Sequence, residues 1–140
     1  SIDSGFVGFG SNWYRVVDAL SGKGLVGWQD ASDVKALWCF GRLINNTDMH
    51  LGNLSFAIDG DVFRLLPAYD ICSMGFAPKS GGDIPPFNFV PKKPESLKLD
   101  EIFSSIEPIA RYFWERVARD ERISKEFKKF LYKGNPADLM

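Results

Sequence analysis

The spacing of apolar residues predicts a mostly helical chain. Helical spacing predicts one helix from Asp30 to about Asn45, and either Asp30 or Ser32 can cap its first turn. Its positions at helical spacing are Val34, Leu37, Trp38, Gly41 and Ile44. A second apolar stripe predicts an amphipathic helix over 106–121, formed by Ile106, Ile109, Ala110, Phe113 and Val117. Residues 12–20 carry a weaker helical pattern, and the lysine-rich stretch 125–133 is typical of a solvated end-helix.

One β-hairpin interrupts this pattern. Two short runs, 54–58 and 61–66, are rich in strand-forming residues and flank Asp59-Gly60. An Asp-Gly pair tolerates the left-handed backbone angles of a two-residue type I′ turn. Counting back from that turn places Asn53 opposite Leu66.

The segment 71–97 is predicted to be a long loop. It carries glycines and prolines throughout, namely Gly75, Pro78, Gly81, Gly82, Pro85, Pro86, Pro91 and Pro94, so neither a helix nor a central strand is expected. Together with the helical stretches, this predicts a mainly α (α+β) fold with one or two small β-hairpins. At 140 residues, we expect one domain over 1–140.

Composition narrows the class of protein. Hydrophobic residues make up 45% and charged residues 25% of the chain, which excludes disorder, and the net charge of −1 argues against a surface that coats nucleic acid. No apolar run reaches the roughly 20 residues of a membrane span, so we expect a cytoplasmic protein with no membrane partner. Cys39 and Cys72 lie in apolar sequence, which predicts reduced, buried thiols. The chain opens at Ser1 without an initiator methionine, so we expect it to be part of a longer protein.

The candidate chemistry lies between the second helix and the hairpin. Phosphoryl transfer needs a carboxylate that orients the attacking hydroxyl, and oxygen ligands for Mg²⁺ on the nucleotide phosphates. Asp48 and Asn53, five residues apart, supply the first two groups, and the hairpin should return Asp70 to the same end. We therefore expect these side chains to converge on one divalent cation.

The sequence also resembles a known family. The string Phe40–Phe56, with Leu65–Ile71, closely resembles the C-terminal region of HipA-family Ser/Thr kinases, many of which are toxins of bacterial toxin–antitoxin pairs. The resemblance implies the C-terminal lobe of a kinase-like fold that uses ATP and Mg²⁺. It implies that Asp48 is the catalytic base and that Asn53 and Asp70 are the Mg²⁺ ligands. His50, the one histidine, is expected to support the loop, because Asp48 already fills the role of the base.

The resemblance also implies partners. The phosphate acceptor would be a Ser or Thr hydroxyl of a protein, the kinase itself included, and translation elongation components are acceptors that the family suggests. A DNA-binding antitoxin, or a fused DNA-binding segment, would lie outside this chain, and no direct nucleic-acid binding by these residues is expected. We further expect the kinase N-terminal lobe to lie outside this chain, since the forty-odd residues before Asp48 cannot hold one. The chain alone should therefore be close to inactive.

Three other interpretations remain open. A small-molecule kinase of the aminoglycoside or choline type has the same spacing in its catalytic loop, although Leu66-Pro67-Ala68-Tyr69-Asp70 favours the HipA type. A degenerate kinase fold could serve as a non-catalytic regulatory module, and a plain helical interaction domain would have no site. Gly8-Phe9-Gly10 and Gly22-Lys23-Gly24 fit no phosphate-loop pattern and are interpreted as turns.

Overall fold

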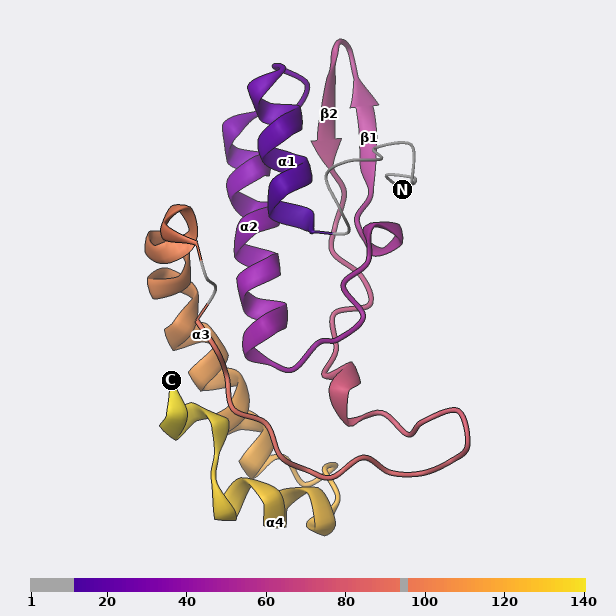
Figure 1. Ribbon diagram of the computed structural model, residues 1–140, viewed down its shortest axis with the longest axis vertical. Helices are drawn as coiled ribbons and strands as arrows, with labels where there is room; N and C mark the ends of the chain where they lie inside the picture. Colours follow the sequence, from indigo (N-terminus) through magenta and orange to yellow (C-terminus); the bar gives the residue numbers. More distant parts are fainter. Residues whose placement is uncertain (1–11, 94–95) are drawn as a thin grey trace. The chain divides into compact units, whose positions relative to one another are not determined.

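In the part that the structure describes, the chain is mainly helical with one small antiparallel sheet, as Figure 1 shows. The structure is a computed structural model that describes residues 12–93 and 96–140, so Gly8-Phe9-Gly10 lies outside the described residues. The helices are α1 (Trp13–Gly22), α2 (Trp28–Leu43), α3 (Asp100–Arg119) and α4 (Lys125–Lys133), and the strands are β1 (Phe56–Asp59) and β2 (Val62–Leu65). The predicted fold class, mainly α with a small hairpin, is confirmed. Within the described ranges, no helix combines the length and the apolar character needed to cross a bilayer.

Contacts along the chain fall into two compact units. Among the described residues, the first unit comprises 12–38 and 48–71, and the second comprises 39–47, 72–93 and 96–140. All four residues predicted for the site, Asp48, His50, Asn53 and Asp70, belong to the first unit.

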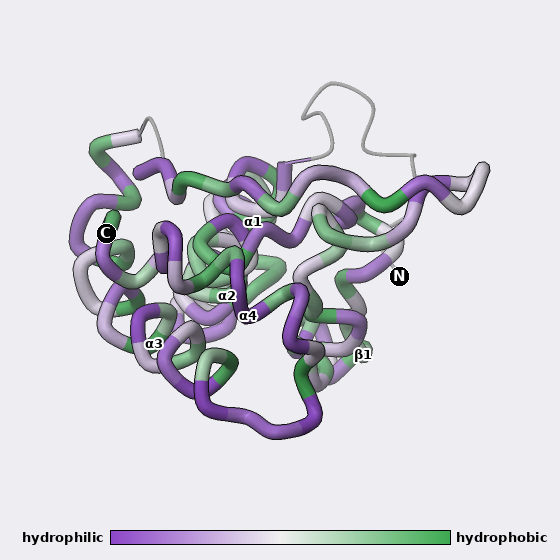
Figure 2. The backbone as a smooth tube through the Cα atoms, turned by 90° about the horizontal axis from the view of Figure 1, so that it is seen from below, coloured by the Kyte–Doolittle hydropathy of each residue, from purple (hydrophilic) through white to green (hydrophobic). Residues whose placement is uncertain are grey.

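Helix α1 supplies much of the core of the first unit. Its N-cap is Asn12, whose Oδ1 accepts a hydrogen bond from the backbone N–H of Tyr14 at 3.2 Å. The helix buries Trp13, Val16, Val17 and Leu20, which share one face because they recur at helical spacing. The core is completed by Val26, Ala31, Val34, Met49 and Leu54. The change between hydrophobic and hydrophilic positions can be followed along the backbone in Figure 2.

Helix α2 begins at Trp28, two residues before the predicted start. Asp30 is therefore not the N-cap but a residue of the first turn, and its carboxylate binds the hairpin. Its Oδ2 accepts a hydrogen bond from the backbone N–H of Leu65 at 2.9 Å and lies 3.3 Å from Nε of Arg64. A side chain that could have capped a helix instead joins α2 to β2.

The hairpin forms where predicted, but its turn and register differ. The turn is Gly60-Asp61 rather than Asp59-Gly60, and Asp59 pairs with Val62. Gly60 has a φ of +62° and is the first central residue, a position that favours glycine. The pairing continues with a hydrogen bond from Leu66 N to Ser55 O. Leu66 therefore lies opposite Ser55 and not opposite Asn53 as predicted, and the pairing ends before Asn53.

In the second unit, α3 begins earlier than predicted, at Asp100 instead of about residue 106. It buries Phe103, Ala110 and Trp114, and Nε1 of Trp114 donates a hydrogen bond to the carbonyl of Leu43 at 3.0 Å. Ile109, predicted to lie in the apolar stripe, is 54% exposed, so that prediction was wrong. The buried face of the helix passes through Trp114 instead.

The long loop is confirmed for the part of 71–97 that the structure describes. It holds the short 3₁₀ turn Met74–Phe76, and a second one, Leu97–Leu99, begins at its last residue. None of its described residues lies in a strand or an α-helix. The N–H of Gly75 donates to the carbonyl of Asn45 at 2.9 Å, and a Cβ at position 75 would collide with the Asn45 side chain. A glycine at 75 therefore permits this close approach.

The two cysteines differ in exposure, so the prediction that both are buried was wrong for Cys72. Both are free thiols, Cys39 fully buried and Cys72 exposed. Burial raises the pKa of the Cys39 thiol to about 11, against a smaller lowering effect of Arg42. The thiolate is the reactive form, and at pH 8 Cys39 is both protonated and covered.

We expect iodoacetamide at pH 8 to modify Cys72 in the folded chain and to modify Cys39 only after unfolding in urea. Peptide mass spectrometry after timed quenching measures the two sites separately. Equal rates of alkylation at the two positions in the folded chain would contradict the burial of Cys39.

Candidate functional site

A hydrogen bond closes the loop that follows α2 into a compact ring. Asn53 ends a 3₁₀ turn (Leu51–Asn53) and is buried, with 9% of its surface exposed. Its side-chain Nδ2 donates to the backbone carbonyl of Asp48 at 2.9 Å. Because the amide nitrogen is used in this bond, Oδ1 is the side-chain atom of Asn53 that is suited to bind a cation.

The side chains of Asp48 and His50 lie on the exposed side of this ring. They are 44% and 57% exposed, and Nε2 of His50 lies 3.6 Å from Oδ1 of Asp48, close enough for an ion pair when the imidazole is protonated. The imidazole also lies against Gly52, where a Cβ would come within 2.8 Å of two ring atoms. His50 is thus placed beside Asp48, and its role as loop support stays a prediction.

Trp13 anchors the loop to α1, a contact that the sequence did not reveal. Its Nε1 donates to the carbonyl of His50 at 2.9 Å, and the side chain is 1% exposed. Met49, inside the ring, and Leu54, the residue after it, are part of the same core. Alternate residues of the loop thus face the core and the solvent, which fixes the loop without covering Asp48.

Asp70 is brought to this loop by the residue before it. The hydroxyl of Tyr69 donates to the carbonyl of Gly52 at 2.6 Å and lies 2.9 Å from Oγ of Ser55. Tyr69 precedes Asp70, and Gly52 precedes Asn53, so the contact joins the segments that carry two of the predicted residues. The paired part of the hairpin ends at Ser55 and Leu66, and the bond between Tyr69 and Gly52 joins the two segments beyond that end. Figure 1 shows the two segments that leave the open end of the hairpin.

The backbone at Asp70 has an unusual conformation. Its φ is +58°, in the left-handed region that few residues other than glycine adopt, and the side chain is exposed. Aspartate tolerates this region better than most residues. Such conformations persist where the surrounding contacts hold them and are frequent at functional sites.

The donor set fits a hard divalent cation. An amide oxygen from Asn53 and a carboxylate from Asp70 are the ligands that Mg²⁺ takes from proteins, usually one or two, with phosphate and water oxygens completing its shell. No cluster of three or more His, Cys, Asp or Glu side chains suited to a metal occurs in residues 12–93 and 96–140. Two protein oxygen ligands of this kind suit a divalent cation whose other ligands come from outside the protein.

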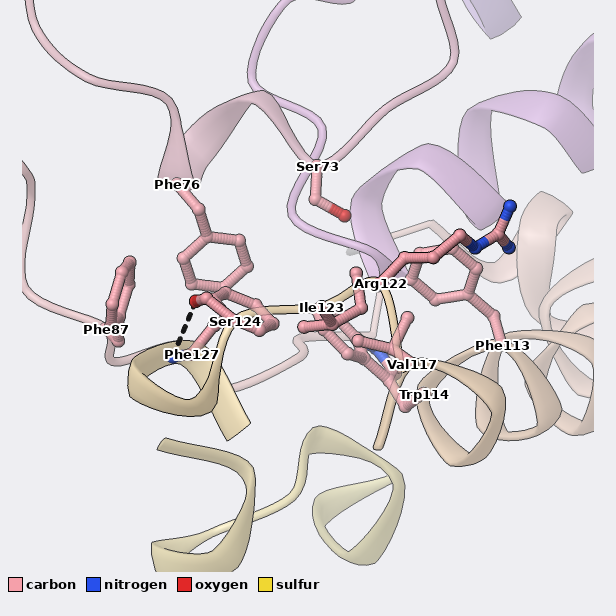
Figure 3. A pocket seen from close by; sticks show the side chains of 10 residues that line it. All are labelled: Ser73, Phe76, Phe87, Phe113, Trp114, Val117, Arg122, Ile123, Ser124 and Phe127. Atoms are coloured by element: carbon pink, nitrogen blue, oxygen red, sulfur yellow. Dashed lines mark hydrogen bonds between the residues drawn. The ribbon is translucent and has the colours of Figure 1, made fainter. Parts of the chain in front are cut away.

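The second unit contains an aromatic pocket of about 370 Å³, shown in Figure 3. Its walls include Phe76, Phe87, Phe113, Trp114 and Phe127. Arg122 also lines the pocket, and its guanidinium binds Asp120 at 2.6 Å and holds the pKa of that carboxyl far below its usual range. The four predicted site residues are not among those that line this pocket.

Comparisons with known proteins agree with the resemblance seen in the sequence. The family model described as the HipA-like C-terminal domain matches residues 12–129. The chain is also 36% identical over 128 residues to a protein named Toxin YjjJ from Escherichia coli strain K12. That match covers 91% of this chain and 29% of the relative, so the chain spans less than a third of the relative's length. No solved structure gives a significant match. The chain thus belongs to the HipA-like C-terminal domain family.

Proposed function

We propose that this chain is the C-terminal catalytic lobe of an ATP-dependent Ser/Thr protein kinase of the HipA type, and that the parent protein is a toxin of a toxin–antitoxin pair. The observation that carries the proposal is the bond from Asn53 Nδ2 to the carbonyl of Asp48 at 2.9 Å. It joins the backbone of Asp48, whose carboxylate is exposed, to the side chain of Asn53 in one turn. Membership of the family and the name of the E. coli relative, a toxin, support the wider assignment.

In this proposal Asp48 is the general base. Its carboxylate is 44% exposed, so an acceptor hydroxyl can reach it and transfer its proton as the phosphorus–oxygen bond forms. His50, 3.6 Å from that carboxylate, would restrict its rotation. Asn53 Oδ1 and the carboxylate of Asp70 would hold Mg²⁺, which when bound neutralises and orients the phosphates of ATP.

Much of the reaction would depend on parts of the parent beyond this chain. ATP would lie between this lobe and a second lobe. The E. coli relative is long enough to hold such a lobe outside the matched region, which covers 29% of it. The acceptor would be a Ser or Thr of a protein, the kinase itself included, with translation elongation components as the acceptors to test first. A DNA-binding antitoxin, or a fused DNA-binding segment, would likewise lie outside these residues.

The direct test is phosphoryl transfer by the full-length parent. We expect incubation with γ-labelled ATP and Mg²⁺ to yield phosphoserine or phosphothreonine on a protein, and omission of Mg²⁺ to abolish the label. A panel of aminoglycosides and choline under the same conditions tests the small-molecule alternative. Label on those acceptors with none on protein would refute the protein-kinase assignment, and Mg²⁺-ATP binding without any transfer would indicate a regulatory module.

A further inference from the structure

The hydroxyl of Tyr69 connects three parts of the first unit. It donates to the carbonyl of Gly52 at 2.6 Å, across 17 positions of sequence, and it lies 2.9 Å from the hydroxyl of Ser55. A phenol has one proton to donate, so the proton given to Gly52 leaves its oxygen to accept from Ser55. The bonds therefore run in one direction, from Ser55 to Tyr69 to Gly52. Hydrogen bonds arranged in such a chain strengthen one another.

The residues on both sides of Asp70 are held, while Asp70 itself is exposed. Tyr69 is held by the two hydroxyl bonds, and Ile71 packs against the core of the first unit. Between them the backbone adopts a φ of +58°. A left-handed residue redirects the chain sharply, and such a bend persists only when its neighbours fix it. The direction of the Asp70 carboxylate thus depends on both anchors.

We propose that Tyr69 is a positioning residue for the candidate cation site: its hydroxyl holds Asp70 at a fixed place beside Asn53. This rests on the proposed function, in which Asp70 and Asn53 bind the cation. Tyr69 does not touch the cation in this proposal. It acts through the carbonyl of Gly52, the residue before Asn53, and through its own peptide link to Asp70.

The exposure of Tyr69 separates positioning from overall stability. The residue is 42% exposed, and both bonds of its hydroxyl are exposed to solvent. Loss of such a bond has a small effect on folding, because water replaces the partner. Loss of the same bond would leave the Asp70 carboxylate less firmly placed. The affinity for the cation should therefore change more than the free energy of unfolding does.

The test uses Tyr69→Phe in the full-length parent, with Mn²⁺ in place of Mg²⁺ and a non-hydrolysable ATP analogue. We expect the Mn²⁺ concentration for half-saturation, measured by electron paramagnetic resonance, to rise about two- to tenfold, the factor that corresponds to one hydrogen bond. Ser55→Ala leaves the bond from Tyr69 to Gly52 in place, so it should raise the Mn²⁺ concentration for half-saturation less than Tyr69→Phe does. Tyr132→Phe is the matched control, since Tyr132 is 82% exposed in α4.

Two further measurements decide the outcome. Melting temperatures of Tyr69→Phe and Tyr132→Phe should agree, and a much larger fall for Tyr69→Phe would indicate a structural role and overturn the proposal. Asp70→Asn tests the proposed function separately. If Asp70→Asn weakens Mn²⁺ binding and Tyr69→Phe does not, the role of Tyr69 is refuted while the cation site stands. If neither variant changes binding, the cation site itself is refuted.

Discussion

Replacing Asp48 with asparagine in the full-length parent is expected to lower the rate of phosphoryl transfer by about 10²- to 10⁴-fold, the contribution typical of a general base. Asparagine has nearly the same shape but accepts no proton from the acceptor hydroxyl. The fold should not change, because Asn53 binds the main-chain carbonyl of residue 48 and not its side chain. The rate of label transfer from γ-labelled ATP measures the effect.

Asp61→Asn is the matched control for this variant. Asp61 is an exposed carboxylate of the same unit, at the tip of the hairpin, and its removal should leave the rate unchanged. Binding of Mg²⁺-ATP should survive in Asp48→Asn, since the proposed ligands are Asn53 and Asp70. A rate for Asp48→Asn equal to that of the control would rule out Asp48 as the base.

Replacing Trp13 with alanine is expected to destabilise the chain by about 3–5 kcal/mol, the range for removing a buried aromatic side chain. Trp13 is 1% exposed, and its Nε1 binds the carbonyl of His50. Trp13→Phe keeps most of the ring but removes that donor, so it should cost about 1–3 kcal/mol, the penalty for a hydrogen-bonding group left without its partner. Urea unfolding followed by circular dichroism gives both free energies.

Trp28→Ala provides the comparison for Trp13. Trp28 is 78% exposed at the start of α2, and its replacement should change the free energy of unfolding by no more than about 0.5 kcal/mol. If Trp13→Ala costs no more than Trp28→Ala, then Trp13 does not anchor the loop that carries Asp48.

The hairpin illustrates what local sequence determines and what it does not. Alternation and an Asp-Gly pair located the hairpin, but glycine fits either central position of a two-residue turn. The observed register coincides with contacts from distant residues: Phe63 N–H donates to Leu25 O at 2.7 Å, and Asp30 accepts from Leu65 N–H. A pattern read along one segment holds no information about such partners, so the turn was misplaced by one residue.

The candidate site was predictable in its chemical groups and not in its supports. Asp48, Asn53 and Asp70 were proposed because phosphoryl transfer uses such groups, and their roles stay a prediction. Trp13 and Tyr69 were missed as supports, since each acts through a main-chain carbonyl, which every residue possesses. The exposure of Ile109 was missed for a related reason, because helical spacing defines a face but not which face meets a neighbour.

The open end of the hairpin also decides how this site could be transplanted into another protein. A designer who copied only the Asp48–Asn53 turn would obtain an amide and one carboxylate, since the other carboxylate arrives with the returning strand. The shortest segment that carries both carboxylates and the amide is therefore 48–71, and its apolar side chains need a surface on which to pack. Extra residues inserted at the Gly60-Asp61 turn would lower the free energy of unfolding only slightly, because the entropy of loop closure grows slowly with loop length. A residue inserted between Leu65 and Asp70 would instead displace the Asp70 carboxylate.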